Sequence, residues 1–150
     1  MKKFEFPLQA VLTLRTLKQE QALEIYARSV QDCATKRSEM LSANRRAEDL
    51  EHLLDQESGQ IFSASMRYAY LKALDASREE VVRREKLLAE AEKLKEQRLN
   101  EFLDRKRKKE VLENLSEKQL KEHMAEGFRR EEIEIEDMVI SRSGAARIAG

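Results

Sequence analysis

Apolar residues recur along this chain in two long segments that lack helix-breaking residues. The first segment runs from Leu8 to Ser58 and the second from Gln60 to Glu126, and neither contains glycine or proline. In the interior of a helix, glycine is about 1 kcal/mol and proline about 3 kcal/mol less favourable than alanine. The pattern therefore predicts two long helices, interrupted in the middle of the chain only at Gly59.

Within both segments the apolar residues recur largely at steps of three, four or seven positions, the repeat of a coiled-coil seam, and Ser29, Lys36 and Glu57 occupy seam positions where the pattern favours apolar residues. The first seam consists of Ala22, Tyr26, Cys33, Met40, Ala43, Ala47, Leu50, Leu54 and Ile61. The second consists of Tyr70, Leu74, Val81, Leu88, Ala91, Phe102 and Leu112. One straight helix would leave such a stripe exposed to water. We therefore expect the two helices to fold back against each other; a kink in one very long helix is the alternative.

The expected fold is all-α, a long two-helix antiparallel coiled coil over residues 1–140. Its reversal is placed near residues 58–65, where Gly59 sits among serines. Ser63 or Ser65 can accept a hydrogen bond from a backbone N–H and so begin the second helix. Residues 141–150 are expected to form a flexible tail.

Composition and charge argue against several classes of protein. The 150 residues are 39% charged and 5% aromatic, which suits a narrow coiled-coil seam better than a globular core. The 29 basic and 29 acidic residues cancel, whereas a nucleic-acid-binding protein needs a basic surplus to neutralise phosphates. A single cysteine cannot form an internal disulfide, which suits a reducing compartment. No targeting segment and no apolar run of about 18 residues is evident, so we expect a cytoplasmic protein.

Residues that could carry enzymatic chemistry are sparse. Asp49 and His52 lie three positions apart on one helical face, but a di-metal site in a helical bundle needs a second such pair, which the sequence lacks. Cys33 lies on the apolar seam without an activating partner. There is no glycine-rich phosphate loop. We expect no catalytic, metal-binding or cofactor-binding residue, and no small-molecule substrate.

Two features remain as candidate binding surfaces. The run Arg105–Lys109 is the densest block of charge, and it is either solvated helix surface or a docking patch for an acidic protein surface. Tyr70 and Leu74 lie one turn apart just after the expected reversal. They either close the coiled coil near its tip or form an exposed apolar pair that contacts a partner.

The beginning of the chain carries the motif Phe4-x-Phe6-x-Leu8-Gln9-x-Val11-Leu12-x-Leu14-Arg15, followed by Glu20 and Ala22. With this motif the chain resembles the flagellar export protein FliJ family. The similarity continues through Ile61, Tyr70 and Leu74 and through Lys109-x-x-Leu112-Glu113-x-Leu115, to about Arg142. The family often ends in an Asp-Glu pair, whereas this chain has the reverse order, Glu136-Asp137.

The resemblance implies a protein without enzymatic activity or cofactor, similar to the central stalk of a rotary ATPase. Such proteins insert the joined ends of their helices into the ring of the export ATPase hexamer and stimulate it. They also contact the export-gate membrane protein and help to recycle substrate chaperones. The protein would then be cytoplasmic, peripherally associated with the inner-membrane export apparatus, and would serve flagellum biogenesis, motility and chemotaxis.

Two sets of contact residues follow from the resemblance. Contact with the export gate is expected at Tyr70 and Leu74, as an exposed pair. Contact with the ATPase ring is expected at Phe4, Phe6, Leu8, Leu12, Arg15, Arg105 and Lys109. A two-helix seam alone is not expected to bury the apolar members of this second set. The alternatives are the equivalent stalk of a virulence type III secretion system and a generic coiled-coil scaffold with no ATPase partner.

Overall fold

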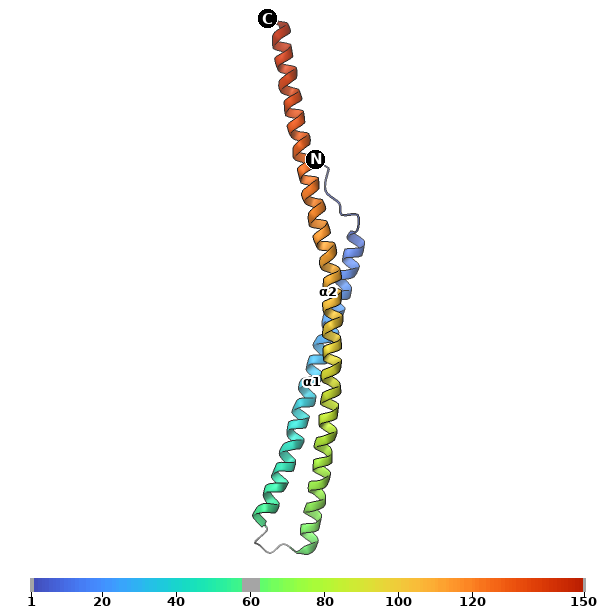
Figure 1. The fold of residues 1–150 in the computed structure, drawn as a ribbon, viewed down its shortest axis with the longest axis vertical. Coiled ribbons are helices and arrows are strands. Elements are labelled where there is room, and N and C mark those ends of the chain that lie inside the picture. Colours follow the sequence, from blue (N-terminus) through green and yellow to red (C-terminus); the bar gives the residue numbers. More distant parts are fainter. Residues whose placement is uncertain (1, 58–62, 150) are drawn as a thin grey trace. The chain divides into compact units, whose positions relative to one another are not determined.

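The computed structural model describes residues 2–57 and 63–149, with side chains at all of these positions except 57 and 146–149. The described chain forms two helices, α1 (Gln9–Glu57) and α2 (Ala64–Ala149), and contains no strand. The helices pack against each other as an all-α hairpin (Figure 1). The expected fold class is therefore confirmed.

Pro7 determines where α1 begins. The N–H of Gln9 donates to the carbonyl oxygen of Phe6 at 3.1 Å, and the N–H of Leu12 donates to that of Leu8 at 2.9 Å. The turn at Pro7 and Leu8 is thus followed directly by the first helical hydrogen bond, from the N–H of Leu12 to the carbonyl oxygen of Leu8. Proline suits this place because its missing N–H would have no helical partner there.

Ser63 caps the start of α2. Its hydroxyl oxygen accepts a hydrogen bond from the N–H of Met66 at 3.2 Å, and its carbonyl accepts one from the N–H of Arg67 at 3.1 Å. This is the N-cap arrangement, in which a side-chain oxygen satisfies an N–H of the first turn. Of the two serines proposed for this role, Ser63 fills it. The rest of the predicted reversal, residues 58–62, lies outside the described residues.

The chain divides into two compact units. We call Glu20–Asp104 the middle unit, and Met1–Gln19 together with Arg105–Gly150 the terminal unit. In the middle unit, ion pairs connect α1 to α2, among them Arg37–Glu92 at 2.9 Å, Glu39–Arg84 at 2.6 Å and Glu51–Arg78 at 2.6 Å. As the residue number rises along α1, the partner's number falls along α2, so the two helices are antiparallel there.

The core of the middle unit is a narrow seam of small and medium-sized residues. Its buried members are Ser29, Cys33, Ala43, Ala47, Leu74, Leu88 and Ala91. All but Ser29 belong to the predicted apolar seams, and Ser29 donates its hydroxyl to the carbonyl of Tyr26 at 2.6 Å. Ser29 is thereby accommodated in the seam because its hydroxyl has a backbone partner.

The terminal unit is also antiparallel, and one of its helices continues alone. Residues near the chain start lie beside later parts of α2: Arg15 contacts residue 108, and Phe4 contacts residue 123. Phe6 and Leu112 are its buried apolar residues. In contrast, every described side chain from 128 to 143 is exposed, so this stretch of α2 has no helix packed along it.

Two further expectations concern the end of the chain and membranes. Residues 141–149 belong to α2, and α2 also runs through Gly127 as helix. The flexibility expected for residues 141–150 stays a prediction, because helical geometry does not measure motion. Within the described ranges, neither helix has a stretch that is long and apolar enough to cross a bilayer.

Candidate functional site

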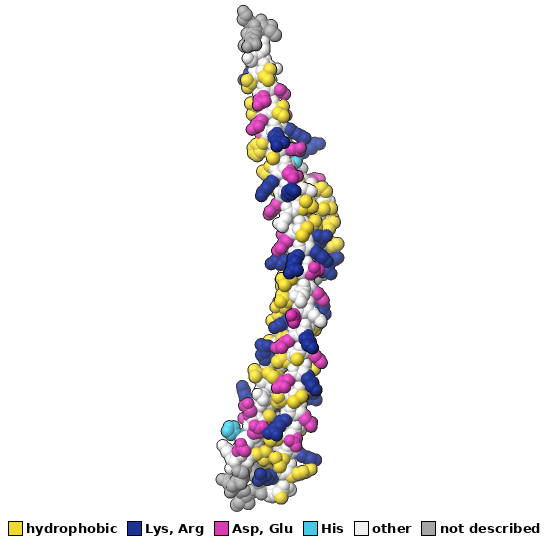
Figure 2. All heavy atoms as spheres, in the orientation of Figure 1, with side chains coloured by type: hydrophobic (Ala, Val, Ile, Leu, Met, Phe, Trp, Pro, Cys, Tyr) yellow, Lys and Arg dark blue, Asp and Glu magenta, His cyan; other side chains and the backbone are white. Residues whose placement is uncertain are grey.

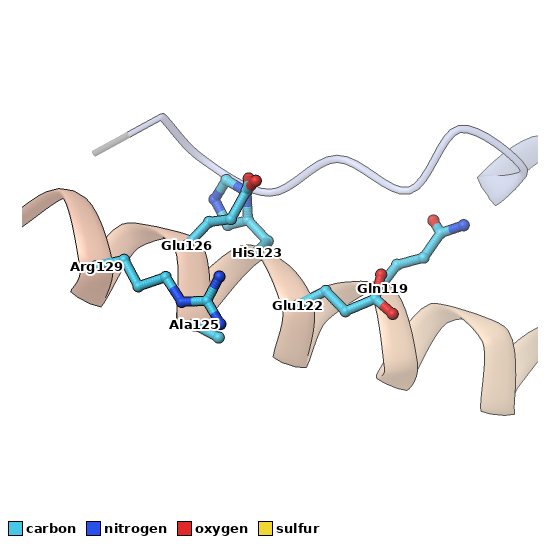
Figure 3. Close-up of a pocket in the computed structure, with 6 residues that line it drawn as sticks. All are labelled: Gln119, Glu122, His123, Ala125, Glu126 and Arg129. Carbon is cyan, nitrogen blue, oxygen red and sulfur yellow. The ribbon is translucent and has the colours of Figure 1, made fainter.

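The segment before α1 is held against α2 in the terminal unit. The Nε2 atom of His123 lies 3.0 Å from the carbonyl oxygen of Lys2, within hydrogen-bond distance. The rings of His123 and Phe4 are 5.6 Å apart between centroids and tilted by 44°, a favourable aromatic geometry. Figure 3 shows the His123 ring directed from α2 toward this segment. The interaction ties the chain start to α2.

Next to this contact α2 carries a polar hollow. Gln119, Glu122, His123, Ala125, Glu126 and Arg129 line it (Figure 3). Two carboxylates and one imidazole are not arranged as metal ligands: among the described residues, no three His, Cys, Asp or Glu side chains group closely enough to hold a metal ion. The hollow therefore offers hydrogen-bonding groups without an evident reactive centre.

The apolar residues expected to contact a ring differ in exposure. Phe6 is buried, at 7% exposed, so the expectation that it stays unburied is wrong. The reason is that the segment before Pro7 runs back along α2, as the contacts of Lys2 and Phe4 with His123 show. Phe4 and Leu12 are half-buried, and Leu8 is exposed.

Part of the exposed apolar surface in the terminal unit was not predicted from the sequence. Val11, Leu14 and Leu17 on α1 are exposed, the last two at 50%. On α2 the exposed large apolar residues of the solitary stretch are Phe128, Ile133, Ile135, Met138, Val139 and Ile140. Figure 2 shows apolar side chains gathered over the start of α1. Leu14 belongs to the N-terminal motif but not to either predicted seam. A leucine outside the seams is expected to be exposed, so the sequence did contain a signal for this surface.

The basic residues expected at the same site fall into two groups. Arg15 donates from Nη1 to the carbonyl oxygen of Lys108 at 2.9 Å. Arg15 and Arg105 line one cavity together with Lys18 and Lys108. Lys109 does not line it and pairs with Glu113 at 3.3 Å along its own helix. The structure thus brings together Arg15 and Arg105, but not Lys109.

Tyr70 and Leu74 do not form an exposed pair. Leu74 is only 5% exposed and Tyr70 is half-buried, so the expected exposure is wrong for Leu74. Leu74 lies on the same helical stripe as Leu88 and packs in the seam of the middle unit. The exposed apolar residues at this end of α2 are instead Met66, Tyr68 and Leu71.

The remaining chemical candidates lie apart from one another. Asp49 and His52 are exposed on α1, and Cys33 is a buried free thiol. Lys36 forms an ion pair with Asp32 at 2.7 Å, and this hydrogen bond raises the pKa of Lys36 above its ordinary value of 10.5. Lys36 therefore stays charged at neutral pH, although it occupies a position on the apolar seam.

Comparison with known proteins agrees with this architecture. A family model described as the flagellar FliJ protein matches residues 4–145, nearly the whole chain. No curated protein and no solved structure matches the chain. The family match confirms the resemblance carried by the N-terminal motif. The chain therefore belongs to the flagellar FliJ protein family and is a component of flagellar protein export.

Proposed function

We propose that the protein is a non-enzymatic coiled-coil stalk whose paired ends enter the ring of the hexameric export ATPase and stimulate its activity. The observation that carries this proposal is the exposed apolar surface of the terminal unit. Leu8, just before α1, and Val11, Leu14 and Leu17 on α1 are between 39% and 50% exposed. On α2, residues 128–143 are wholly exposed and include six large apolar side chains. Apolar surface of this extent on one region of a chain marks a contact surface.

A stalk inside a ring needs few anchoring contacts and an otherwise polar surface. Binding energy at interfaces is concentrated in a small number of buried apolar anchors, and complementary charges align the partners. In this proposal Phe4, Leu8 and Leu12 supply anchors, and Phe6 supports them from beneath. Arg15, Arg105 and Lys109 meet acidic groups of the ring, the docking alternative for the basic run.

For the export gate, we propose that contact occurs at the start of α2, in the middle unit. Tyr70 is half-buried and offers part of its ring to a partner, whereas Leu74 beneath it holds the helix in place from the seam. Leu71, next to Tyr70 along the chain, is 44% exposed. Support for this contact comes from the family and from the exposure of Leu71 beside Tyr70.

The proposal also includes contact with substrate chaperones and a peripheral association of the protein with the export apparatus at the inner membrane. Both rest on membership of the family, as do a cytoplasmic location and a requirement in motility and chemotaxis. The family is flagellar, which favours a flagellar stalk over a virulence stalk or a scaffold without an ATPase. No nucleic acid is expected among the partners, because the net charge is zero.

The ATPase contact is tested by removing exposed apolar side chains without touching the seam. Leu14→Ser with Leu17→Ser should reduce stimulation of the purified export ATPase roughly tenfold or more, as expected for loss of interface anchors. The helix content measured by circular dichroism should change little, because both side chains are 50% exposed.

A matched control lies in the middle unit. Leu23→Ser with Leu41→Ser removes two leucines of similar exposure, 46% and 52%, from the same helix. This variant should stimulate the ATPase like the unmodified protein. Full stimulation by the Leu14/Leu17 variant, or an equal loss in the control, would contradict a ring contact at the terminal unit.

The gate contact is tested by comparing two tyrosines one half-turn apart. Tyr70→Ser should reduce swimming and the secretion of flagellar proteins while stimulation of the ATPase remains normal. Tyr68→Ser serves as control, because Tyr68 is 61% exposed and its ring faces Lys72 at 5.1 Å within α2. If Tyr70→Ser lowers the melting temperature enough to unfold the helix ends, Tyr70 acts in packing and the gate assignment fails.

A further inference from the structure

Four cationic side chains surround one small cavity in the terminal unit. Arg15 and Lys18 extend from α1, and Arg105 and Lys108 extend from α2; together they form its entire lining. The cavity has a volume of about 240 Å³. The hydrogen bond from Arg15 to the Lys108 carbonyl connects the two helices at this point. The antiparallel packing of the unit therefore brings together charges that are far apart in sequence.

Two other cations of the same basic run, Lys106 and Lys109, have acidic partners along α2. Lys106 lies 4.0 Å from Glu110, and Lys109 lies 3.3 Å from Glu113. By contrast, Arg15, Lys18 and Arg105 have no carboxylate within ion-pair distance in the described part of the chain. Cations that converge on a concave site repel one another and raise the local positive potential. The cavity consequently attracts an anion.

We propose that this cavity binds a free phosphate anion, inorganic phosphate or diphosphate. The guanidinium groups of Arg15 and Arg105 and the ammonium group of Lys18 match a multiply charged oxyanion, because guanidinium donates in pairs to neighbouring oxygens and ammonium acts as a point charge. The volume is smaller than the roughly 300 Å³ at which ordinary ligand pockets begin. No aromatic or apolar side chain lines the cavity to hold a nucleobase. The phosphate group itself is therefore what the site recognises.

A bound phosphate would connect α1 to α2. Its oxygens would accept hydrogen bonds from side chains of both helices and replace their mutual repulsion by attraction. Phosphate should therefore stabilise the pairing of the two chain ends, because a ligand that binds only the folded state raises its stability. This inference does not rest on the proposed ATPase contact, although Arg15 and Arg105 belong to both.

The test measures phosphate binding to the full chain alone. Isothermal titration calorimetry with inorganic phosphate at pH 7.5, against sodium chloride at equal ionic strength, should show saturable binding. Phosphate should also raise the melting temperature by more than chloride does. Lys18→Gln and Arg105→Gln should each weaken binding roughly tenfold or more, as for loss of a charge-assisted hydrogen bond. Lys121→Gln removes an exposed lysine of the same unit outside the cavity and should bind normally.

The same variants verify that loss of binding is not loss of folding. Without phosphate and at low salt, Lys18→Gln should melt no lower than the unmodified chain, because removing one cation relieves repulsion. An equal response to phosphate and chloride, or unchanged affinity in both cavity variants, would overturn the proposal. Binding only to vesicles that contain phosphatidic acid would overturn it as well. None of these outcomes depends on the export ATPase, so the result is independent of the proposed ring contact.

Discussion

The middle and terminal units use the same two helices in different ways. In the middle unit, α1 and α2 are connected by side-chain ion pairs of opposite sign, such as Arg37–Glu92 and Glu39–Arg84. In the terminal unit, the hydrogen bonds between distant parts of the chain end on backbone carbonyl oxygens, at Lys108 and Lys2. The helices of the terminal unit are thus joined through backbone acceptors, whereas those of the middle unit are joined through pairs of oppositely charged side chains.

The burial of apolar residues also differs between the two units. The middle unit buries seam residues on both helices, among them Cys33 and Ala47 on α1 and Leu74 and Ala91 on α2. The terminal unit buries Phe6 and Leu112, and exposes apolar side chains along residues 128–143. The middle unit therefore contains most of the buried seam, whereas the terminal unit contains the long solitary stretch of exposed apolar side chains. Stability is therefore expected to reside mainly in the middle unit, and the proposed ring contact in the terminal unit.

The largest expected effect comes from the seam of the middle unit. Leu88→Ala should lower the free energy of unfolding by about 2–5 kcal/mol, because truncation of a buried leucine leaves a cavity. Leu94→Ala is the control, because it makes the same change on the same helix at a residue that is 41% exposed. It should change the free energy of unfolding by no more than about 0.5 kcal/mol. Thermal melts followed by circular dichroism give the comparison.

Hydrogen exchange extends this test to the division into units. Leu88→Ala should increase exchange at backbone amides of residues 20–104 more than in the terminal unit, whereas Leu112→Ala should do the reverse. Equal loss of protection in both units, from either substitution, would show that they unfold as one cooperative body. The two units would then differ in the residues they expose but not in their stability.

The sequence predicted most of the fold because a coiled-coil seam is a local, periodic signal. Cys33, Ala47 and Leu88 are buried as their spacing indicated, and Ser63 caps α2 because short hydroxyl side chains suit that position. These outcomes depend on residues within one or two helical turns of one another.

What the sequence did not predict depends on the register between distant segments. Lys18 was not recognised as a candidate, because its significance arises only when α2 places Arg105 and Lys108 around the same cavity. Likewise, the burial of Phe6 depends on how the segment before Pro7 lies against α2. Helical spacing defines the face of each helix but not which turn of the partner it meets.

A smaller effect is expected from the ion pairs that connect the helices of the middle unit. A double-mutant cycle on Arg37 and Glu92 should give a coupling of roughly 0.2–1 kcal/mol, since both side chains are about half exposed. The pair Glu24–Arg28 within α1 is the control, at roughly 0.3–0.5 kcal/mol. At about 1 M salt both couplings should shrink, because the Debye length falls to about 3 Å. A coupling energy of zero between Arg37 and Glu92 at low salt would show that this ion pair does not stabilise the middle unit.

The smallest expected effect is the pH dependence contributed by Lys36, a charged residue on the seam of the middle unit. Its ion pair with Asp32 raises the pKa of Lys36 above 10.5 in the folded chain. Folding thus favours the protonated form, so the contribution is fully present below the ordinary pKa of 10.5 and is lost as pH rises through the folded pKa. Lys36→Arg is the matched variant, because arginine remains charged throughout. Melting temperatures of the two proteins should run parallel from pH 7 to 10, and the unmodified protein should fall further by pH 11.5. Parallel curves over the whole range would show that the charge of Lys36 does not stabilise the seam.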